Sequence, residues 1–254
     1  MVAPGNKKLR SCVHNADVSS YQGLIFSQGF ARLARDVVYS EEGGVVNFEI
    51  GNYEYKEGSS NSSKDTTYRW IYGCVKLSRG MPHMILDARS NNRDLFGYNS
   101  FSNLPVFLDK EQILSLEGNF DKYFTLYAPK EYERDALYIF TPDVMALLID
   151  MANKFDIEVV DDRLYIYARI GVISAPESET IYQMFSIMQS IGVKLSQNSE
   201  YYSDEFVGDK SSKVVGEGGR RLASPVTRIA LAIGIGVAIY IICMIAVVNI
   251  IPYM

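Results

Sequence analysis

The chain has 254 residues, of which 25 are basic and 30 acidic, so its formal net charge is −5. Nucleic-acid phosphates need a positively charged protein face, and we therefore expect no nucleic-acid partner. The three cysteines include no CxxC pair and show no regular spacing, which argues against a zinc site and a disulfide framework. We expect reduced thiols, no metal and no cofactor.

The chain divides into four parts by composition. Its first residues carry three basic side chains with no apolar core after them, so we expect no signal peptide. We predict an N-terminal segment at 1–22 that is loosely ordered and a folded domain at 23–202. A flexible tether at 203–228 and a transmembrane helix at 229–251 follow.

The first half of the domain has the composition of an antiparallel sheet. Its segments are rich in β-branched and aromatic residues, and Tyr68, Trp70 and Tyr72 alternate with their neighbours. The polar stretch 56–65 is typical of an exposed hairpin loop. The predicted strands are 45–50, 53–55, 66–77, 84–86 and 123–127.

Two helices are predicted in the second half. Thr141 is an N-cap residue, followed by a proline and an aspartate in the first turn and by the apolar run 144–149. Ser174 and Glu177 have the spacing of a capping box, and an apolar stripe follows at 181–191.

Between these helices, the apolar segments 157–160 and 164–170 flank an acidic stretch at 161–163, which predicts a β-hairpin. Strands dominate the first half of the domain and helices the second. We therefore predict an α+β fold, in which two or three helices pack on an antiparallel β-sheet, plus one C-terminal transmembrane helix.

The run 229–251 contains no Asp, Glu, Lys, Arg or His. As a helix it would be about 34 Å long, enough to cross a hydrocarbon core of about 30 Å. The juxtamembrane basic residues Arg220, Arg221 and Arg228 precede it, and the uncharged residues 252–254 follow it. The positive-inside rule then predicts a single-pass plasma-membrane protein whose N-terminal domain faces the cytoplasm.

Small residues recur every fourth position in the predicted membrane helix, at Ala230, Gly234 and Ala238. This spacing lets two membrane helices approach closely, and it would give a homodimer through the transmembrane helix. The alternative is that alanine and glycine are simply common in membrane helices.

Histidine is scarce, with two in the chain. A catalytic interpretation pairs His83 with Asp87 as an orienting carboxylate and Cys74 as a nucleophile. The alternative, which we favour, is that His83 begins a strand and bonds the backbone, since no nucleophile motif surrounds these residues. The polar run 87–94 either lines a groove or forms a turn rich in Asn and Asp, and we favour the turn.

Several stretches resemble an uncharacterised family of bacterial membrane-anchored proteins. The resemblance spans most of the domain, and it implies kinship but no activity, because that family has no assigned catalytic or binding residues. The stretches are GLIFSQG (23–29), FEIGNYEY (48–55), RGMPHMILDARSNN (79–92), LEGNFDKYFTLYAP (116–129), IFTPDVMALLID (139–150) and GRRL (219–222).

Two classes of function follow from these observations. The first, which we favour, is a non-catalytic cytoplasmic domain that is anchored in the lipid bilayer and binds an unidentified protein or lipid partner. The second is a membrane-tethered, hydrolase-like enzyme that uses His83 and Asp87. The enzyme requires that both side chains converge in a concave pocket.

Overall fold

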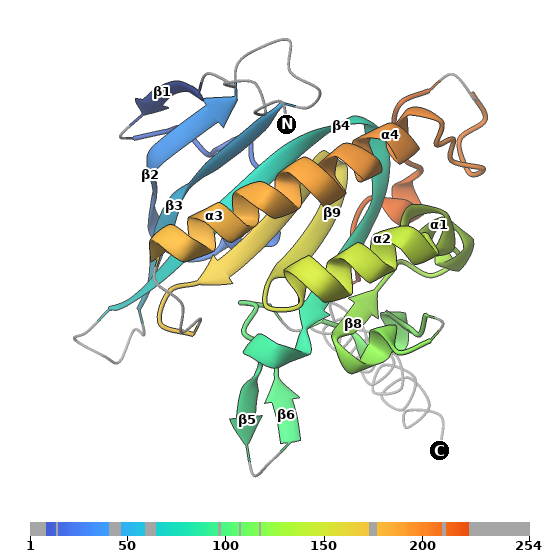
Figure 1. Cartoon of the computed structure of the whole chain (residues 1–254). Coiled ribbons are helices and arrows are strands. Elements are labelled where there is room, and N and C mark those ends of the chain that lie inside the picture. The colour runs from blue at the N-terminus through green and yellow to red at the C-terminus, as the bar shows by residue number, and fades with distance from the viewer. Residues whose placement is uncertain are drawn as a thin grey trace, which may run out of the picture.

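The computed structural model describes residues 9–13, 15–40, 47–58, 65–95, 98–106, 108–116, 118–172, 177–209 and 212–223. These residues form an antiparallel sheet with helices packed on one face, which confirms the predicted α+β class (Figure 1). Among them, no helix is long and apolar enough to cross a membrane. The predicted transmembrane run 229–251 lies outside the described residues.

Within the described residues, seven strands form one sheet in the order β1-β2-β3-β4-β8-β7, with β9 paired to β4. The first half of β4 pairs with β3 and its last residues with β8, whereas β9 runs along the opposite edge of both halves. The hairpin β5–β6 projects away from this sheet (Figure 1). The strands are β1 Leu9–Val13, β2 Phe30–Ser40, β3 Phe48–Glu57, β4 Thr66–Ala88, β5 Arg93–Leu95, β6 Tyr98–Phe101, β7 Ile113–Leu114, β8 Phe124–Tyr127 and β9 Asp156–Arg169.

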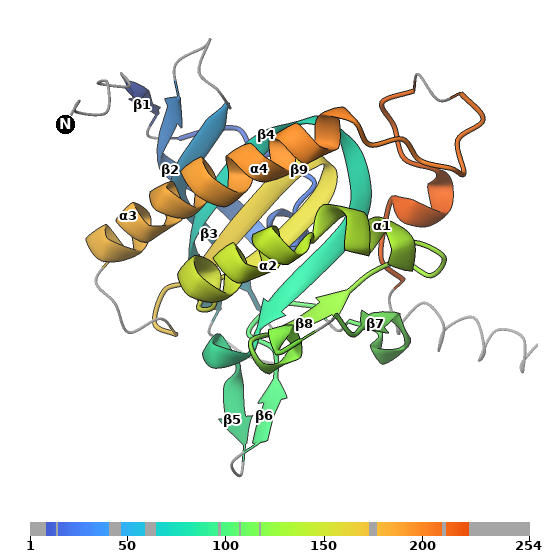
Figure 2. The ribbon, with the colours of Figure 1, turned by 45° about the vertical axis from the view of Figure 1, so that its right-hand side comes forward.

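Strand β4 arches around β9 (Figure 2). Between the cross-strand pairs Lys76–Arg163 and Met84–Val159, β4 advances eight residues while β9 advances four. Thus β4 follows the longer path around the bend, with an irregular stretch near Met81. On β9 the bend falls at Asp161, whose φ is 51°.

The predicted hairpin at 157–170 is wrong, because β9 is one continuous strand that pairs with β4 on both sides of Asp161. The irregularity changes which residues face the helices. Ile157 belongs to the helix-side core before the bend, and Leu164 and Ile166 belong to it after the bend. A residue added to a strand moves the following side chains to the opposite face, which explains this change.

The helices cover one face of the sheet (Figure 2). Helices α3 and α4 are continuous across one π-helical turn, and α2 ends in another. Helix α2 begins at Pro142 after the N-cap Thr141, as predicted, because proline suits the first helical position. The α-helical bounds are α1 Glu133–Ile139, α2 Pro142–Leu147, α3 Glu177–Ile187 and α4 Val193–Glu200. The π-helical turns are η5 Leu148–Ala152 and η6 Met188–Gly192, and the 3-10 turns are η1 Leu24–Ser27, η2 Arg89–Asn91, η3 Lys110–Gln112, η4 Phe120–Lys122 and η7 Glu217–Gly219.

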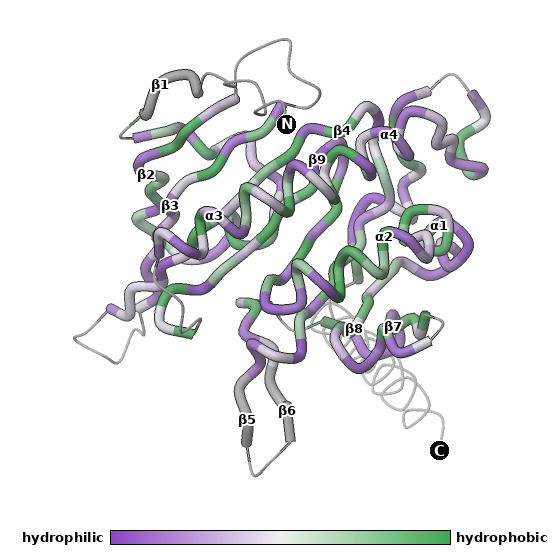
Figure 3. Tube along the Cα trace, in the orientation of Figure 1, coloured by the Kyte–Doolittle hydropathy of each residue, from purple (hydrophilic) through white to green (hydrophobic). Residues whose placement is uncertain are grey.

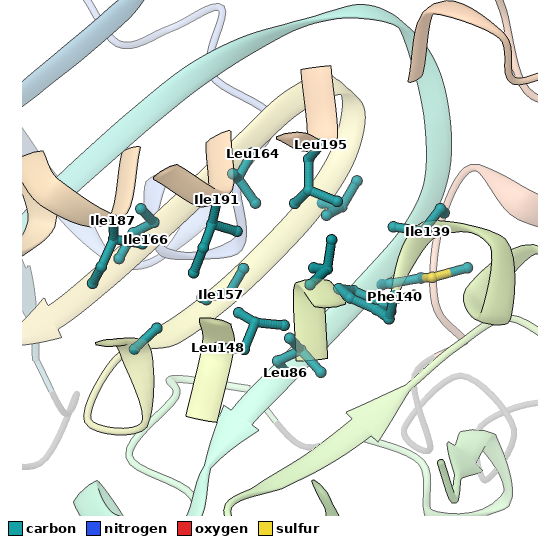
Figure 4. Packing of buried hydrophobic residues seen from close by; sticks show 14 of the residues in the cluster. Leu86, Ile139, Phe140, Leu148, Ile157, Leu164, Ile166, Ile187, Ile191 and Leu195 are labelled. Atoms are coloured by element: carbon teal, nitrogen blue, oxygen red, sulfur yellow. The ribbon is translucent and has the colours of Figure 1, made fainter. Parts of the chain in front are cut away.

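The main core lies between the sheet and these helices. Hydrophobic residues recur along β9 and along the helices that cover it (Figure 3). Figure 4 shows Ile187, Ile191 and Leu195 of the α3–η6–α4 segment directed toward Leu164 and other sheet residues. Burial of such side chains contributes about 1.5–3 kcal/mol each, so this layer fixes the bent sheet against the helices.

A second core lies on the other face of the sheet and is rich in aromatic side chains. Phe26 of η1 packs against Tyr53 and Tyr72, with ring centroids 4.7 and 5.1 Å apart. Of the N-terminal segment 1–22, β1 pairs with β2, and the Tyr21 ring lies 5.0 Å from that of Phe26. The described part of that segment therefore lies against the sheet.

Candidate functional site

His83 and Asp87, the candidate catalytic residues, both lie on β4 and are nearly inaccessible to solvent. Their exposed fractions are 8% and 3%. Four residues of extended strand separate their Cα atoms by about 13 Å. His83 is bonded to Glu158 of β9 and Asp87 to Asn92, so the strand does not bring the two side chains together.

His83 is bonded to a buried carboxylate. Its Nε2 lies 2.7 Å from Oε1 of Glu158, which is 1% exposed. The other oxygen of Glu158 accepts hydrogen bonds from the Tyr167 hydroxyl at 2.6 Å and from the Leu24 backbone N–H at 2.8 Å. The carboxylate therefore joins β4, β9 and η1.

The second ring nitrogen of His83 defines its tautomer. The Leu222 backbone N–H donates to Nδ1 of His83 at 3.0 Å. Because Nδ1 accepts a hydrogen bond, the proton of the neutral ring lies on Nε2, which donates to Glu158. Both ring nitrogens are thus occupied by structural bonds.

Asp87 faces a second buried carboxylate, Asp156, which is 1% exposed. Asp156 accepts hydrogen bonds from the Ala88 backbone N–H and the Asn103 side-chain amide, both at 2.9 Å. Asp87 accepts a longer one, 3.4 Å, from the Asn92 side chain. Burial raises the pKa of both aspartates, and the charge of Asp87 adds to the increase at Asp156.

The polar run after Asp87 forms a turn, as favoured from the sequence. The 3-10 turn η2 occupies Arg89–Asn91. The Asn91 side-chain amide donates to the Lys154 carbonyl at 3.2 Å, and the Ser90 hydroxyl donates to the Asn153 carbonyl at 2.6 Å. These asparagine and serine side chains fix the turn to the chain that precedes β9.

Cys74, the nucleophile of the catalytic interpretation, is a free and buried thiol. Burial raises its pKa to about 12. The thiolate is the nucleophilic form, so a thiol with a raised pKa reacts poorly. Its Sγ lies 3.6 Å from the Arg163 guanidinium, which lowers the pKa only in part.

We expect Cys74 to resist alkylation in the folded protein. With iodoacetamide at pH 8, mass spectrometry should find Cys74 unmodified in buffer and fully modified in denaturant. The denatured sample is the matched control, because its thiol is exposed. Alkylation of Cys74 at equal rates in both samples would contradict the burial argument.

Within the described residues, no group of three or more His, Cys, Asp or Glu side chains could hold a metal ion. A cleft of about 280 Å³ near Asn52 contains charged side chains that pair with one another. There, Glu54 lies 2.8 Å from Arg35 and 3.7 Å from Arg69. Its lining carries two arginines and three carboxylates, and both arginines lie within 4 Å of Glu54.

The segment after α4 lies against the domain. Within the predicted tether 203–228, the structure describes 203–209 and 212–223. Arg221 pairs with Asp161 at the bend of β9, at 2.9 Å, and Arg220 donates to the Val215 carbonyl. The Ala223 backbone N–H donates to Oε1 of Gln112 at 2.8 Å, and Nε2 of Gln112 donates to the Ala223 carbonyl at 2.9 Å.

We call residues 204–223 the C-terminal segment. Arg228 and the small residues Ala230, Gly234 and Ala238 lie outside the described residues, so their predicted roles remain predictions.

The α1 cleft is a groove of about 440 Å³ between α1 and the residues that follow α4. Three of its aromatic side chains are exposed: Tyr201 is 78% exposed, Phe206 56% and Tyr138 44%. Its lining includes Glu131, Arg134, Asp135, Tyr138, Tyr201 and Phe206.

The wall of the α1 cleft that follows α4 is held by Asp204, which is 5% exposed. Asp204 accepts hydrogen bonds from the Tyr132 hydroxyl at 3.0 Å and from the backbone N–H groups of Phe206 and Gly216 at 2.8 and 2.7 Å. The Tyr132 ring also packs against Phe206 at 5.1 Å. These contacts hold the turn that carries Phe206 at the edge of the cleft.

The cleft is acidic. Burial, with the charges of Asp204 and Glu205, raises the pKa of Asp135, although its hydrogen bond from the Tyr202 hydroxyl at 2.6 Å opposes this change. Arg134 of the lining lies 3.7 Å from Glu205, with 87% of its side chain exposed. Arg134 therefore pairs with Glu205 at the rim of the cleft.

Comparisons with known proteins assign no function. No family model matches the chain, and searches of curated proteins and of solved structures find no match.

Sequence reasoning missed the α1 cleft. Its residues come from two stretches, 131–138 and 201–206, and the second stretch crosses the predicted boundary at residue 202. The sequence YYSDEF at 201–206 mixes aromatic and acidic residues, and this was the available signal. Pairing it with α1 required the tertiary structure.

Proposed function

We propose that this chain is a non-catalytic binding domain that faces the cytoplasm at the inner face of the plasma membrane and binds a protein partner through the α1 cleft. The observation that carries this proposal is the combination of a 440 Å³ groove with three exposed aromatic side chains. Exposed aromatic residues beside a groove are typical of interaction sites, because they supply large contact area at low entropic cost.

The burial of the candidate catalytic groups supports a binding role over the enzyme alternative. His83 and Asp87 are bonded to Glu158 and Asn92, and burial raises the pKa of Cys74. A general base must reach a substrate proton within hydrogen-bond distance, directly or through water. Side chains with 8% and 3% exposure are poorly placed for that step.

A protein partner fits this cleft better than a lipid one. Anionic headgroups would meet the carboxylates of Glu131, Asp135 and Glu205, and like charges disfavour such an approach. Attraction to an anionic leaflet is proposed only for the juxtamembrane residues Arg220, Arg221 and Arg228, at about 1 kcal/mol for each residue near the surface.

The membrane part of the proposal rests on the sequence. Residues 229–251 would cross the bilayer once, with Arg228 on the cytoplasmic side. Ala230, Gly234 and Ala238 would form the pairing face of a homodimer. A reporter fused after Met254 should then appear outside the cytoplasm, and a cytoplasmic signal would overturn this orientation.

The binding role is tested with the full chain in mild detergent. Proteins crosslinked to the wild-type chain in cells are compared with those captured by a Tyr201→Ala/Phe206→Ala variant. The matched control is Tyr182→Ala, because Tyr182 is 71% exposed on α3 and does not line the cleft.

We expect a specific partner to be lost with the cleft variant and retained with the control. Equal capture by all three chains would refute the cleft as the binding site. Binding of anionic vesicles that depends on Tyr201 and Phe206 would instead indicate a lipid partner.

A further inference from the structure

The chemistry of the α1 cleft indicates what kind of group it binds, and this inference rests on the proposed function. The cleft combines carboxylates with exposed aromatic rings. The carboxylates of Glu131, Asp135 and Glu205 contribute three negative charges, against one positive charge from Arg134. Asp204 lies directly behind this wall. The cleft thus has a negative potential that favours a positively charged occupant.

The guanidinium of Arg134 does not neutralise the carboxylates of the cleft. The side chain of Arg134 is 87% exposed, and its guanidinium lies at 3.7 Å from Glu205, whose side chain is 78% exposed. An exposed ion pair of this length contributes little free energy, about 0–1 kcal/mol. An incoming cation can therefore bind at Asp135 and Glu131 without displacing a strong internal pair.

The aromatic side chains provide the second feature of a cation site. A ring face attracts a Lys ammonium or an Arg guanidinium within about 6 Å of its centroid. Tyr201, Phe206 and Tyr138 all line the cleft and keep between 44% and 78% of their surface exposed. Their rings also offer apolar surface for the methylene stem of such a side chain.

The shape of the cleft favours a peptide over a small free cation. Its volume of about 440 Å³ lies within the usual range for ligand sites, about 300–1,000 Å³, and exceeds the space that one ammonium group needs. One wall is a helix and the other is a turn held by Asp204, so the two walls form an open groove. An extended segment of a partner can lie along such a groove.

We propose that the α1 cleft binds a basic peptide segment of the partner protein, with a Lys or Arg side chain placed between the aromatic rings and the carboxylates. Asp135 and Glu131 pair with the cationic group, and Tyr201 and Phe206 contact its charge and its stem. These four residues would then both form the contact surface for the partner and select for a positively charged side chain.

The test uses the full chain in mild detergent and a fluorescent peptide of alternating Lys and Gly. The uncharged control peptide alternates Gln and Gly. Anisotropy is measured at 0.15 M salt, where the Debye length is about 8 Å, so that distant charges of the acidic domain contribute little. In a third measurement, without peptide, binding of the chain to vesicles that contain anionic lipid is compared between the wild type and the cleft variant.

We expect the Lys peptide to bind and the Gln peptide to bind at least tenfold more weakly. Two cation–π contacts at about 0.5–1 kcal/mol each predict a loss of about 5- to 30-fold for Tyr201→Ala/Phe206→Ala. Tyr182→Ala should bind as the wild type does. Glu131→Gln should weaken binding about threefold, whereas its charge-matched control Glu179→Gln, on α3 outside the cleft, should not.

The side chains of Tyr201 and Phe206 are exposed, so these variants should fold, and an unchanged melting temperature checks this. Equal binding of the Lys peptide by the cleft variant and the wild type would overturn the proposal. Cleft-dependent capture of a partner without binding of the Lys peptide would leave the proposed function standing and refute the basic segment. Cleft-dependent vesicle binding would refute both.

Discussion

Replacing Glu158 by alanine is expected to lower the free energy of unfolding by about 3–5 kcal/mol, because each buried donor left without an acceptor costs about 1–3 kcal/mol. The change removes the acceptor for three buried donors, namely the His83 imidazole, the Tyr167 hydroxyl and the Leu24 backbone N–H. Typical domains have a total stability of about 5–15 kcal/mol, so this variant should be close to unfolding. Urea unfolding followed by fluorescence of Trp70, the single tryptophan of the chain, measures the change.

Two variants control this prediction. Glu158→Gln keeps one oxygen acceptor and the side-chain shape, so we expect a smaller loss, of about 1–3 kcal/mol. Glu111→Ala removes an exposed pair with Lys130 at 2.9 Å, which should cost about 0–1 kcal/mol. If Glu158→Ala cost no more than Glu111→Ala, the buried network would contribute nothing to stability.

The second large effect is expected from Asp156→Asn, and it depends on pH. The pKa values of Asp87 and Asp156 are raised in the folded protein by burial, with the charge of Asp87 adding to the increase at Asp156. A raised folded-state pKa contributes stability that is fully present below the ordinary aspartate pKa of about 3.9 and is lost as the pH rises through the folded-state pKa. Wild-type stability should therefore fall between pH 5 and pH 9.

Asp156→Asn removes one of the two negative charges and keeps an oxygen that can accept the Ala88 hydrogen bond. At 1.36 kcal/mol per pKa unit, we expect the variant to be more stable than the wild type at pH 9 by about 1–3 kcal/mol, with a smaller difference at pH 5. Urea unfolding at both pH values gives the comparison.

The matched surface control is Asp143→Asn. Its contact with Lys194 lowers the pKa of Asp143 to about 2, so this carboxyl is ionised in both the folded and unfolded states above pH 5. Its replacement should leave the stability difference between pH 5 and pH 9 unchanged. A wild-type pH slope that persists in Asp156→Asn would show that another group causes it.

The fold class and the local signals of helix α2 were predictable from the sequence. Thr141 and Pro142 mark the start of that helix, because N-cap and first-turn preferences act within a few residues. The alternation around Trp70 likewise predicted a strand. These signals are short-range, and the structure confirms them where its described residues include them.

The bend of β9 was not predictable by the same means. Asp161, Asp162 and Arg163 have the composition of a turn, and the residues do leave regular strand geometry at Asp161. The ladder continues because β4 supplies a matching irregularity near Met81. Only the partner strand distinguishes a bend within a strand from the turn of a hairpin.

The buried acidic groups were also hidden from sequence reasoning. Glu158 and Asp156 stand among apolar residues in β9, and pattern alone does not reveal that their donors come from η1, β4 and residue 103. The contacts of Leu222 and Ala223 involve backbone groups, which carry no residue-specific signal. Composition therefore predicted a tether where part of the chain lies against the domain.

With residues 229–251 in a bilayer, as proposed, the docking of the C-terminal segment would limit how far the domain can stand from it. A free chain from Tyr202 to Ile229 could extend over about 90 Å at about 3.5 Å per residue. Ala223 is bonded to Gln112, and only residues 224–228 separate it from the proposed span. The stand-off distance between Ala223 and the start of the span is then at most about 20 Å. The edge of the domain that carries Gln112 would then lie close to the lipid, and a partner of the α1 cleft would bind near the bilayer surface.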